Sequence, residues 1–507
     1  MKRLLSVILL AVMFLSLLPG CSTEEAYVPT GDALDQDEKP QPPTDPDKGR
    51  ALSLPWYPMA SLNPFSCTDY TNRVLFSLIY QGLFAVGQNY EATPILCKNY
   101  NISTDMRTYT FYLEEATFSD GTSITPEDVV ASLKASMGSA WYGSRLQHVA
   151  PIAVYGDAVV LELDTPMYNL PVLLDIPIVK ASQVDAETPL GSGPYRMDGA
   201  RLRRQAGWWC NASLPVSADE IFLVQAESPA KIRDTFEAGG ISIVCSDPGD
   251  DDYVDFRSDY ELWDAETGLF LYLACNAESV IFSNDAIRTA LTHAIDRDAL
   301  TDDYYHGFAV GATLPVSPKS PYYSSSLAEK YQYRPELFLD AVTNAALEDN
   351  AVTLLLCRDD PIRLRIGQTV AGMLEAGGLK VTIDEATSAD FTKKLDAGEY
   401  DLYLAQTKLS VTMDLSAFFG PESSLNYGGL SNPNLHHISL EALANAGNYY
   451  NLHEMVMEDA HLCPILFHDY AIYVNRGSVS GLEPARDNLF FYDLGRTMAD
   501  ALVSTES

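Results

Sequence analysis

Positive charge is scarce in this 507-residue chain. Lysine and arginine number 33 against 69 aspartates and glutamates, so the formal net charge at pH 7 is −36. A surface of that sign repels a phosphate backbone along most of its area, so nucleic acid is not expected as a partner. We attribute most of the acidity to solubility rather than to a site for cationic ligands.

Motifs for catalysis are also missing. No G-x-x-x-x-G-K-[ST] run for nucleotide phosphates occurs. Gly477 and Gly481 have the spacing of a G-x-S-x-G elbow, but Val479 stands in the place of the nucleophile. We therefore predict that the protein is not an enzyme and has no catalytic residue. A surface hydrolase is the remote alternative, because catalytic groups need to be close only in space.

Sequence motifs for metal binding are incomplete as well. No CxxC pair occurs, and the helix that begins like a zincin motif at His453 has Met457 where the second histidine belongs. The acidic stretch 247–255 lacks the mid-loop glycine and the terminal glutamate of a calcium loop, so a solvated loop is expected. The sequence therefore predicts neither a metal nor a cofactor.

The number of cysteines does not favour a disulfide framework. Seven cysteines remain when Cys21 is set aside, and an odd number leaves at least one unpaired or paired between chains. Cys245, Cys275 and Cys357 each end an apolar run, where a buried cysteine behaves as a small hydrophobic residue.

The longest apolar run at the N-terminus, Leu4 to Leu18, follows Lys2 and Arg3. It is short for a membrane-spanning helix of about 20 residues and suits a secretory signal. The run closes with LPGC, which resembles the lipobox of bacterial lipoproteins, and this predicts a signal peptide with lipobox over 1–21 and lipid attachment at Cys21. The alternative is an ordinary signal peptide with an incidental cysteine. With two or more acyl chains on Cys21, the protein would stay on the extracytoplasmic face of the cell membrane.

Residues 22–50 differ from the rest of the chain. They hold five prolines and eight acidic side chains but few large apolar groups. Such a segment buries too little surface to offset the entropy of ordering it. We predict a disordered tether between the lipid and the body of the protein.

Two stretches of the body predict secondary structure clearly. In the first, Tyr109, Phe111 and Leu113 alternate as in a strand with one buried face, and a helix capped by Thr125 starts at Pro126. We expect that helix to pack on the preceding strand through one face, made of Val129, Val130, Leu133 and Met137.

The second stretch alternates strands and helices. Strands are expected at 352–357, 379–384 and 400–405, with helices from Pro361 to Gly377 and over 389–396. This order implies a parallel sheet. Upstream, another amphipathic helix enters from Asn284, and His293 lies off its apolar stripe, which favours a solvated histidine over a ligand.

Several short segments follow one another in an order that resembles one family. They are SLNPF (61–65), IYQGLF (79–84), FSDGT with the following TPEDVV, GSGPY (191–195) with GWW (207–209), and IRTALTHAIDRDAL (287–300). Together they resemble the extracytoplasmic solute-binding proteins of the peptide/nickel type, the receptor components of ABC importers, similar to the dipeptide- and oligopeptide-binding proteins.

The resemblance implies an α/β, two-lobed fold of the type II periplasmic-binding-protein kind, with an extra subdomain in the first lobe. Lobe 1 would take 51–268 and 471–507, and lobe 2 would take 269–470. The length of the chain agrees, because two or three domains are expected for 507 residues.

The function that the resemblance implies is capture of a small solute, a peptide in the first instance, for ABC permease subunits driven by a separate ATPase. A monomer that closes around its solute is expected. The alternatives keep the fold but change the solute to an oligosaccharide, a metal chelate or a signalling peptide, with sensing rather than import as the output.

In the peptide-binding relatives, a W-x-x-D-Y-x-D-P-like motif follows the third strand of the second lobe, and its first aspartate clamps the ammonium of the peptide. Here Lys408 falls on the tryptophan, Val411 on the clamping aspartate and Asp414 on the second acid. The amine clamp is thus replaced by an apolar wall and a cation, which favours a solute with an anionic or hydrogen-bond-accepting group there. Asp414 is the group that could compensate for the missing clamp by binding the ammonium itself. The alternative is a differently placed gap in the alignment.

Further candidates for the cleft are Tyr70, Asn72, Asn426 and Tyr427.

Replacing Cys21 with serine removes the sulfur that would carry the lipid. We expect Cys21→Ser protein to leave the membrane fraction or to remain unprocessed, which cell fractionation and mass spectrometry of the N-terminus measure. A Cys21→Ser protein that is cleaved normally and still fractionates with membranes would show that the lipid assignment is wrong.

Overall fold

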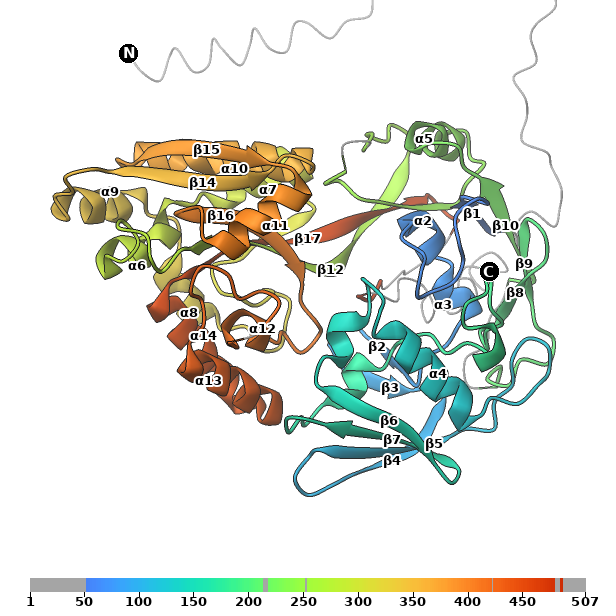
Figure 1. Ribbon diagram of the computed structural model, residues 1–507. Helices are drawn as coiled ribbons and strands as arrows, with labels where there is room; N and C mark the ends of the chain where they lie inside the picture. Colours follow the sequence, from blue (N-terminus) through green and yellow to red (C-terminus); the bar gives the residue numbers. More distant parts are fainter. Residues whose placement is uncertain (1–51, 213–217, 251–252, 422, 479–483, 487–507) are drawn as a thin grey trace, which may run out of the picture. The chain divides into compact units, whose positions relative to one another are not determined.

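The computed structural model describes residues 52–478, apart from 213–217, 251–252 and 422, together with 484–486 (Figure 1). The expected signal peptide (1–21), lipobox and tether (22–50) lie outside the described residues. All described residues belong to one unit, Gly49–Ser507. Within them, no helix has both the length and the apolar composition needed to cross a membrane.

The largest sheet has seven strands in the order β11-β17-β12-β16-β14-β15, with β13 also paired to β17. Its two longest strands, β12 and β17, run antiparallel side by side (Figure 1). The strands span β11 Ile243–Ser246, β12 Tyr260–Cys275, β13 Ala309–Gly311, β14 Ala351–Cys357, β15 Lys380–Ala386, β16 Leu402–Lys408 and β17 Leu462–Asn475.

The expected strand–helix unit forms the far end of this sheet. β14 pairs in parallel with both β15 and β16, as predicted. The connecting helices are α10, Pro361–Ala376, and α11, Ser388–Ala397. Helix α10 buries its apolar side against the sheet through Ile362, Ile366, Val370 and Leu374.

The IRTALTHAIDRDAL segment forms α6 (Asp285–Ala294) and α7 (Arg297–Tyr305). Arg297 is buried, and its guanidinium donates to the carbonyl oxygens of Ala312 at 2.8 Å and Pro464 at 2.7 Å. Because an uncompensated buried cation is costly, these acceptors fix α7 on the sheet. His293 is half-buried rather than solvated, and its Nδ1 lies 2.6 Å from the carbonyl oxygen of Gln332.

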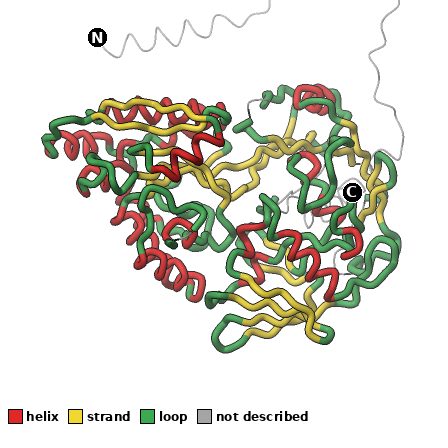
Figure 2. Tube along the Cα trace, in the orientation of Figure 1, coloured by secondary structure: helices red, strands yellow, loops and turns green. Residues whose placement is uncertain are grey.

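A separate four-stranded antiparallel sheet has the order β4-β5-β7-β6. Figure 2 shows its strands as adjoining yellow segments. The strands are β4 Cys97–Ile102, β5 Thr108–Leu113, β6 Val149–Tyr155 and β7 Ala158–Leu163, and a hairpin of β2 Phe84–Val86 and β3 Ala92–Pro94 lies beside them in sequence. Tyr109 and Phe111 are buried as predicted, and Leu113 is half-buried.

Helix α4, Pro126–Ser136, begins at the predicted cap, but its packing differs from the prediction. It lies chiefly against β6 and β7 rather than against β5. The reason is the strand order, which places β7 between β5 and β6. Val129 and Leu133 are fully buried, whereas Met137 lies beyond the helix and is exposed.

The third sheet has four strands in the order β1-β10-β9-β8. The GSGPY segment precedes β8, and its glycines are required by close packing: a Cβ on Gly191 would lie 2.2 Å from the carbonyl oxygen of Ile79, and one on Gly193 would lie 2.5 Å from that of Leu78. Trp208 of the GWW segment donates from Nε1 to the Ser192 carbonyl at 2.8 Å. The strands are β1 Leu52–Trp56, β8 Tyr195–Met197, β9 Arg201–Arg204 and β10 Glu220–Gln225.

The remaining elements are short helices around these sheets. They are α2 Tyr70–Arg73, α3 Phe76–Ile79, α5 Pro229–Glu237, α8 Ser325–Ala328, α9 Pro335–Asn344, α12 Ser416–Phe419, α13 Pro433–Ala444 and α14 Tyr449–Asp459, with 3-10 turns at Gly143–Leu146, Leu170–Leu173, Ala181–Gln183, Glu329–Tyr331 and Ala446–Asn448.

All seven cysteines of the described residues are free thiols. Cys245 and Cys275 are buried, as predicted for cysteines that end apolar strands, while Cys357 is half-buried at the end of β14. Burial raises the pKa of Cys245 to about 12, so this thiol stays protonated at neutral pH.

Asp128 gives a direct test of the local structure around α4. Its carboxylate accepts hydrogen bonds from the backbone N–H of Thr125 at 2.9 Å and of Ala181 at 2.8 Å. Asp128→Ala should leave both donors unpaired and lower the free energy of unfolding by about 1–3 kcal/mol. Glu127→Ala, on the exposed side of the same turn, is the control and should change it by less than about 0.5 kcal/mol. Urea denaturation measures both, and equal effects would contradict the assignment.

Candidate functional site

The pairing of β12 with β17 is interrupted near its middle. The register shifts between Glu266 and Leu269, which marks a β-bulge. Gly268 has φ +72°, and a Cβ there would overlap the guanidinium of Arg486, so only glycine fits. The Thr267 hydroxyl donates to the His468 carbonyl at 2.5 Å and ties the bulge to β17.

Two cavities lie at this bulge. The larger, of about 340 Å³, is lined by Tyr90, Trp263, Glu266, Lys319, Val411 and Arg486, among others. The smaller, of about 20 Å³, is lined by Tyr70, Arg73, Trp141, Thr267 and Tyr470, among others, and also by Glu266. Glu266 therefore connects the two cavities, and we refer to them together as the cleft.

Glu266 is nearly buried, with 9% of its surface exposed. Its Oε2 accepts a hydrogen bond from the hydroxyl of Tyr90, whereas its Oε1 is buried and has no hydrogen-bond partner among the described residues. An unpaired buried carboxylate oxygen is costly, and Glu266, which lines both cavities, keeps one such unused acceptor.

Lys319 links two further acids beside the larger cavity. Its Nζ donates to Asp469 at 2.8 Å and also to Asp264. Asp469 is almost fully buried, and burial raises the pKa of its carboxyl group to about 6 in spite of Lys319. Its Oδ1 has no partner among the described residues. The single ammonium of Lys319 thus faces two carboxylates.

Lys408, a predicted site residue, ends β16 beside the smaller cavity. Its Nζ donates to the Thr267 carbonyl at 2.6 Å and lies 4.0 Å from the ring centroid of Trp141. The guanidinium carbon of Arg73 lies 4.0 Å from the same ring centroid. Trp141 therefore interacts with two cations, which connects β16 with the segment after α4.

Of the two N-terminal candidates, only Tyr70 lines the cleft. Its ring centroid lies 3.8 Å from that of Tyr470, and its hydroxyl is 2.8 Å from Sγ of Cys245. Asn72 is fully buried, and its side-chain amide is engaged by the backbone of Tyr57 and Ala60. Asn72 thus shapes the turn that carries Tyr70.

Asp414 meets the segment before β6. Its Oδ2 lies 2.9 Å from Nε2 of His148 and accepts from the Gln147 amide, and its Oδ1 accepts from the backbone N–H of Ser416 at 2.8 Å. Burial opposes ionisation of Asp414, but these hydrogen bonds and the charge of His148 lower its pKa below the usual value. Val411, three residues earlier, lines the larger cavity as an apolar wall.

Asn426 and Tyr427 line neither cavity of the cleft. Asn426 donates from Nδ2 to the carbonyl of Gly420 at 2.8 Å. The ring centroid of Tyr427 lies 6.4 Å from that of Tyr403 in β16, which also contacts Tyr400. Both residues are half-buried and hold the segment between α12 and α13.

The sequence did not single out Glu266, Lys319, Tyr90 or Trp263 as site residues. They come from separate parts of the chain, and each is ordinary in its local pattern. One signal was present: Gly268 stands directly before the apolar run 269–275, and an isolated strand glycine marks a bulge or a close approach.

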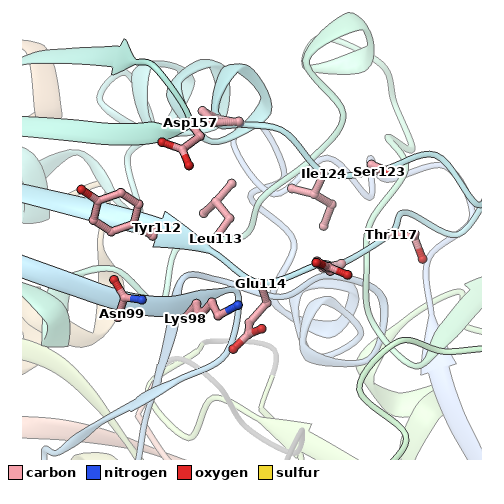
Figure 3. Close-up of a pocket in the computed structure, with 12 residues that line it drawn as sticks. Lys98, Asn99, Tyr112, Leu113, Glu114, Thr117, Ser123, Ile124 and Asp157 are labelled. Atoms are coloured by element: carbon pink, nitrogen blue, oxygen red, sulfur yellow. The ribbon is translucent and has the colours of Figure 1, made fainter.

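A further groove of about 840 Å³ lies on the β4–β5 sheet and shares no lining residue with the cleft (Figure 3). It is lined by Lys98, Tyr112, Glu114, Ser123 and Asp157, among others. Among the described residues of the whole chain, no group of three or more histidine, cysteine, aspartate or glutamate side chains is placed to hold a metal ion.

Residues 91–426 match the family described as bacterial extracellular solute-binding proteins, family 5, middle region. The chain belongs to this family. The family resemblance stated for the sequence is thereby confirmed, and members of the family bind solutes outside the cytoplasm. The match covers the β4–β5 sheet, the bulge of β12 and the parallel unit β14–β16.

This solute-binding protein is similar to several known proteins. The glutathione-binding protein GsiB of Escherichia coli (strain K12) is 24% identical over 286 residues, which cover 52% of this chain and 56% of GsiB. The chain thus matches about half the length of this curated relative.

Among solved structures, HbpA2 from Haemophilus parasuis aligns with a TM-score of 0.73 at 18% identity over 87% of this chain and 98% of that one. The protein AgaA of Agrobacterium tumefaciens R10, in complex with agropinic acid, aligns with a TM-score of 0.63 at 20% identity over 89% and 97% of the two chains. These similarities confirm the two-lobed α/β fold of the type II periplasmic-binding-protein kind.

The pair of His148 and Asp414 predicts a pH-dependent stability. Burial alone would lower the pKa of His148, but Asp414 and Asp164 raise it above its usual value of about 6.5. A raised histidine pKa stabilises the fold fully below about pH 6.5 and less as the pH rises through the folded pKa. Asp414→Asn should therefore cost more stability at pH 6 than at pH 9, by about 1–3 kcal/mol.

Thermal or urea unfolding of the wild type and of Asp414→Asn across this pH range measures the difference. Asp164→Asn is the control. The Asp164 Oδ1 lies 3.0 Å from Nδ1 of the same imidazole, but the Asp164 side chain is 68% exposed, so its ion pair is screened by solvent. A cost of Asp414→Asn that is the same at both pH values would contradict the ion pair.

Proposed function

We propose that the protein is the lipid-anchored substrate-binding component of an ABC importer. It captures a small solute, a peptide in the first instance, in the cleft and presents it to membrane permeases driven by a separate ATPase. The observation that carries the proposal is the cleft itself. Its cavities are built from distant parts of the chain, and Glu266, which lines both, has an unpaired buried carboxylate oxygen.

We further propose that residues 51–268 and 471–507 form lobe 1 and that residues 269–470 form lobe 2. The bulge between Glu266 and Leu269 supports the first boundary, because a break in strand pairing is a place where a two-stranded connection can bend. β17 pairs with β12 on both sides of this bulge, so the two strands would act together as the hinge.

Closure would bring side chains of both lobes onto the solute. On these boundaries, Tyr70 belongs to lobe 1, and Lys408 and Asp414 belong to lobe 2. The other three candidates would not contact the solute and would instead hold the backbone near the cleft in place; they are Asn72, Asn426 and Tyr427. The contacts of Lys408 with Trp141 and of Asp414 with His148 would then join the lobes in the closed form.

Two relatives support an alternative to a peptide as the solute. GsiB is named as a glutathione-binding protein, and AgaA is seen with agropinic acid, so related proteins of this fold take solutes beyond ordinary peptides. The same chain could serve a sensor instead of an importer. Neighbouring permease and ATPase genes would favour import.

Mass spectrometry of the solute that co-purifies with the mature protein tests capture directly. Adding that solute to unloaded protein should reduce the radius of gyration in small-angle scattering, because binding favours the closed form. Disrupting the Lys408–Trp141 contact with Lys408→Met should weaken binding with little change in the fold. An unchanged radius at saturation would contradict closure.

A further inference from the structure

Among the residues that the structure describes, Glu266 is the one carboxylate that lines both cavities of the cleft. Oε2 is occupied by the Tyr90 hydroxyl, so the charge of the carboxylate is only partly compensated. Oε1 is buried without a partner, and no ion pair of Glu266 with a described residue is present. A buried anion left in this condition is stable only if a cation or several donors reach it.

The cations near the cleft have other acceptors. Lys319 donates to Asp264 and Asp469, and Lys408 donates to the Thr267 carbonyl. Arg486 donates to the carbonyl oxygens of Leu409 and Ser410. The larger cavity is lined by two acids, Asp264 and Glu266, and by two cations, Lys319 and Arg486. Because Lys319 divides its ammonium between Asp264 and Asp469, it does not pair with Glu266.

The walls beside Glu266 suit a cation with a hydrocarbon stem. Val411 lines the larger cavity as an apolar surface, and Trp263 contributes an indole ring to the same cavity. An aromatic ring attracts a cation through its π face, and an apolar wall accommodates methylene groups. A bare metal ion is disfavoured, because among the described residues no set of three metal-binding side chains is assembled there.

We infer that the carboxylate of Glu266 anchors an alkylammonium group of the solute in the larger cavity, with Val411 and Trp263 around its stem. This inference rests on the proposed function and names the chemical class of its solute. In the peptide-binding relatives the residue that binds the ammonium lies at the position of Val411, after β16. In this protein the inference assigns that role to Glu266, at the bulge of β12. The sequence predicted an anionic or hydrogen-bond-accepting group at Val411, and the inference differs from that prediction because Glu266 lines the same cavity.

The test uses three probes of equal length: butylammonium, 1-butanol and butyrate. Saturation-transfer NMR at pH 7 with unloaded protein should show contact for butylammonium only. Glu266→Gln keeps an acceptor for Tyr90 but removes the charge, and should weaken butylammonium binding by roughly tenfold or more. Glu266→Asp keeps the charge and should retain part of the binding.

Glu261→Gln is the matched control, because Glu261 lies on the same strand and lines neither cavity of the cleft. It should bind butylammonium like the wild type. Circular dichroism establishes that each variant is folded. Absence of butylammonium contact in the wild type, or equal binding by Glu266→Gln, would overturn the inference.

These results separate the inference from the proposed function. If Glu266→Gln binds butylammonium unchanged while a co-purified solute still compacts the protein, the anchor is wrong and solute capture stands. If no solute co-purifies and no compaction occurs, solute capture itself is contradicted, whatever the behaviour of butylammonium.

Discussion

The antiparallel pairing of β12 with β17 is the contact on which the rest of the structure depends. These strands join the parallel unit of β14, β15 and β16 to β11 and, through β13, to the segment that carries Lys319. The bulge between Glu266 and Leu269 interrupts this pairing, and Glu266 and Thr267, at the bulge, line the cavities of the cleft. Strand hydrogen bonds resume on both sides of the bulge, so β12 and β17 stay joined before and after the cleft.

Charge is distributed unevenly around the cleft. The chain carries a formal charge of −36, yet the cations Arg73, Lys319 and Arg486 line the cleft. A fourth cation, Lys408, contacts the lining residues Thr267 and Trp141. Each is held against carboxylates, carbonyl oxygens or aromatic rings, so they organise the site more than they offer positive charge. Burial raises the pKa of Asp469 to about 6, and the neighbouring carboxylates of Asp264 and Glu266 add to this shift, while Lys319 opposes it.

The structure explains why several residues of the family motifs have the side chains they do. Gly191 and Gly193 are glycines because the backbone of α3 approaches too closely for a side chain. Arg297 is buried because carbonyl oxygens of two other segments meet its guanidinium. None of these residues touches the cleft, so the resemblance identified the fold far better than it identified the site.

The sequence by itself determined the local elements and the family. The cap at Thr125, the parallel unit from Val352 and the helix from Asn284 form as predicted, because capping, turn residues and apolar periodicity act over a few neighbouring residues. The tertiary structure decided which strands α4 covers, that Asn72 faces the backbone, and that Glu266 meets Tyr90 and Val411 in one cavity. Such meetings depend on strand order and on a bulge, which bring together residues more than a hundred positions apart, and no local pattern encodes that distance.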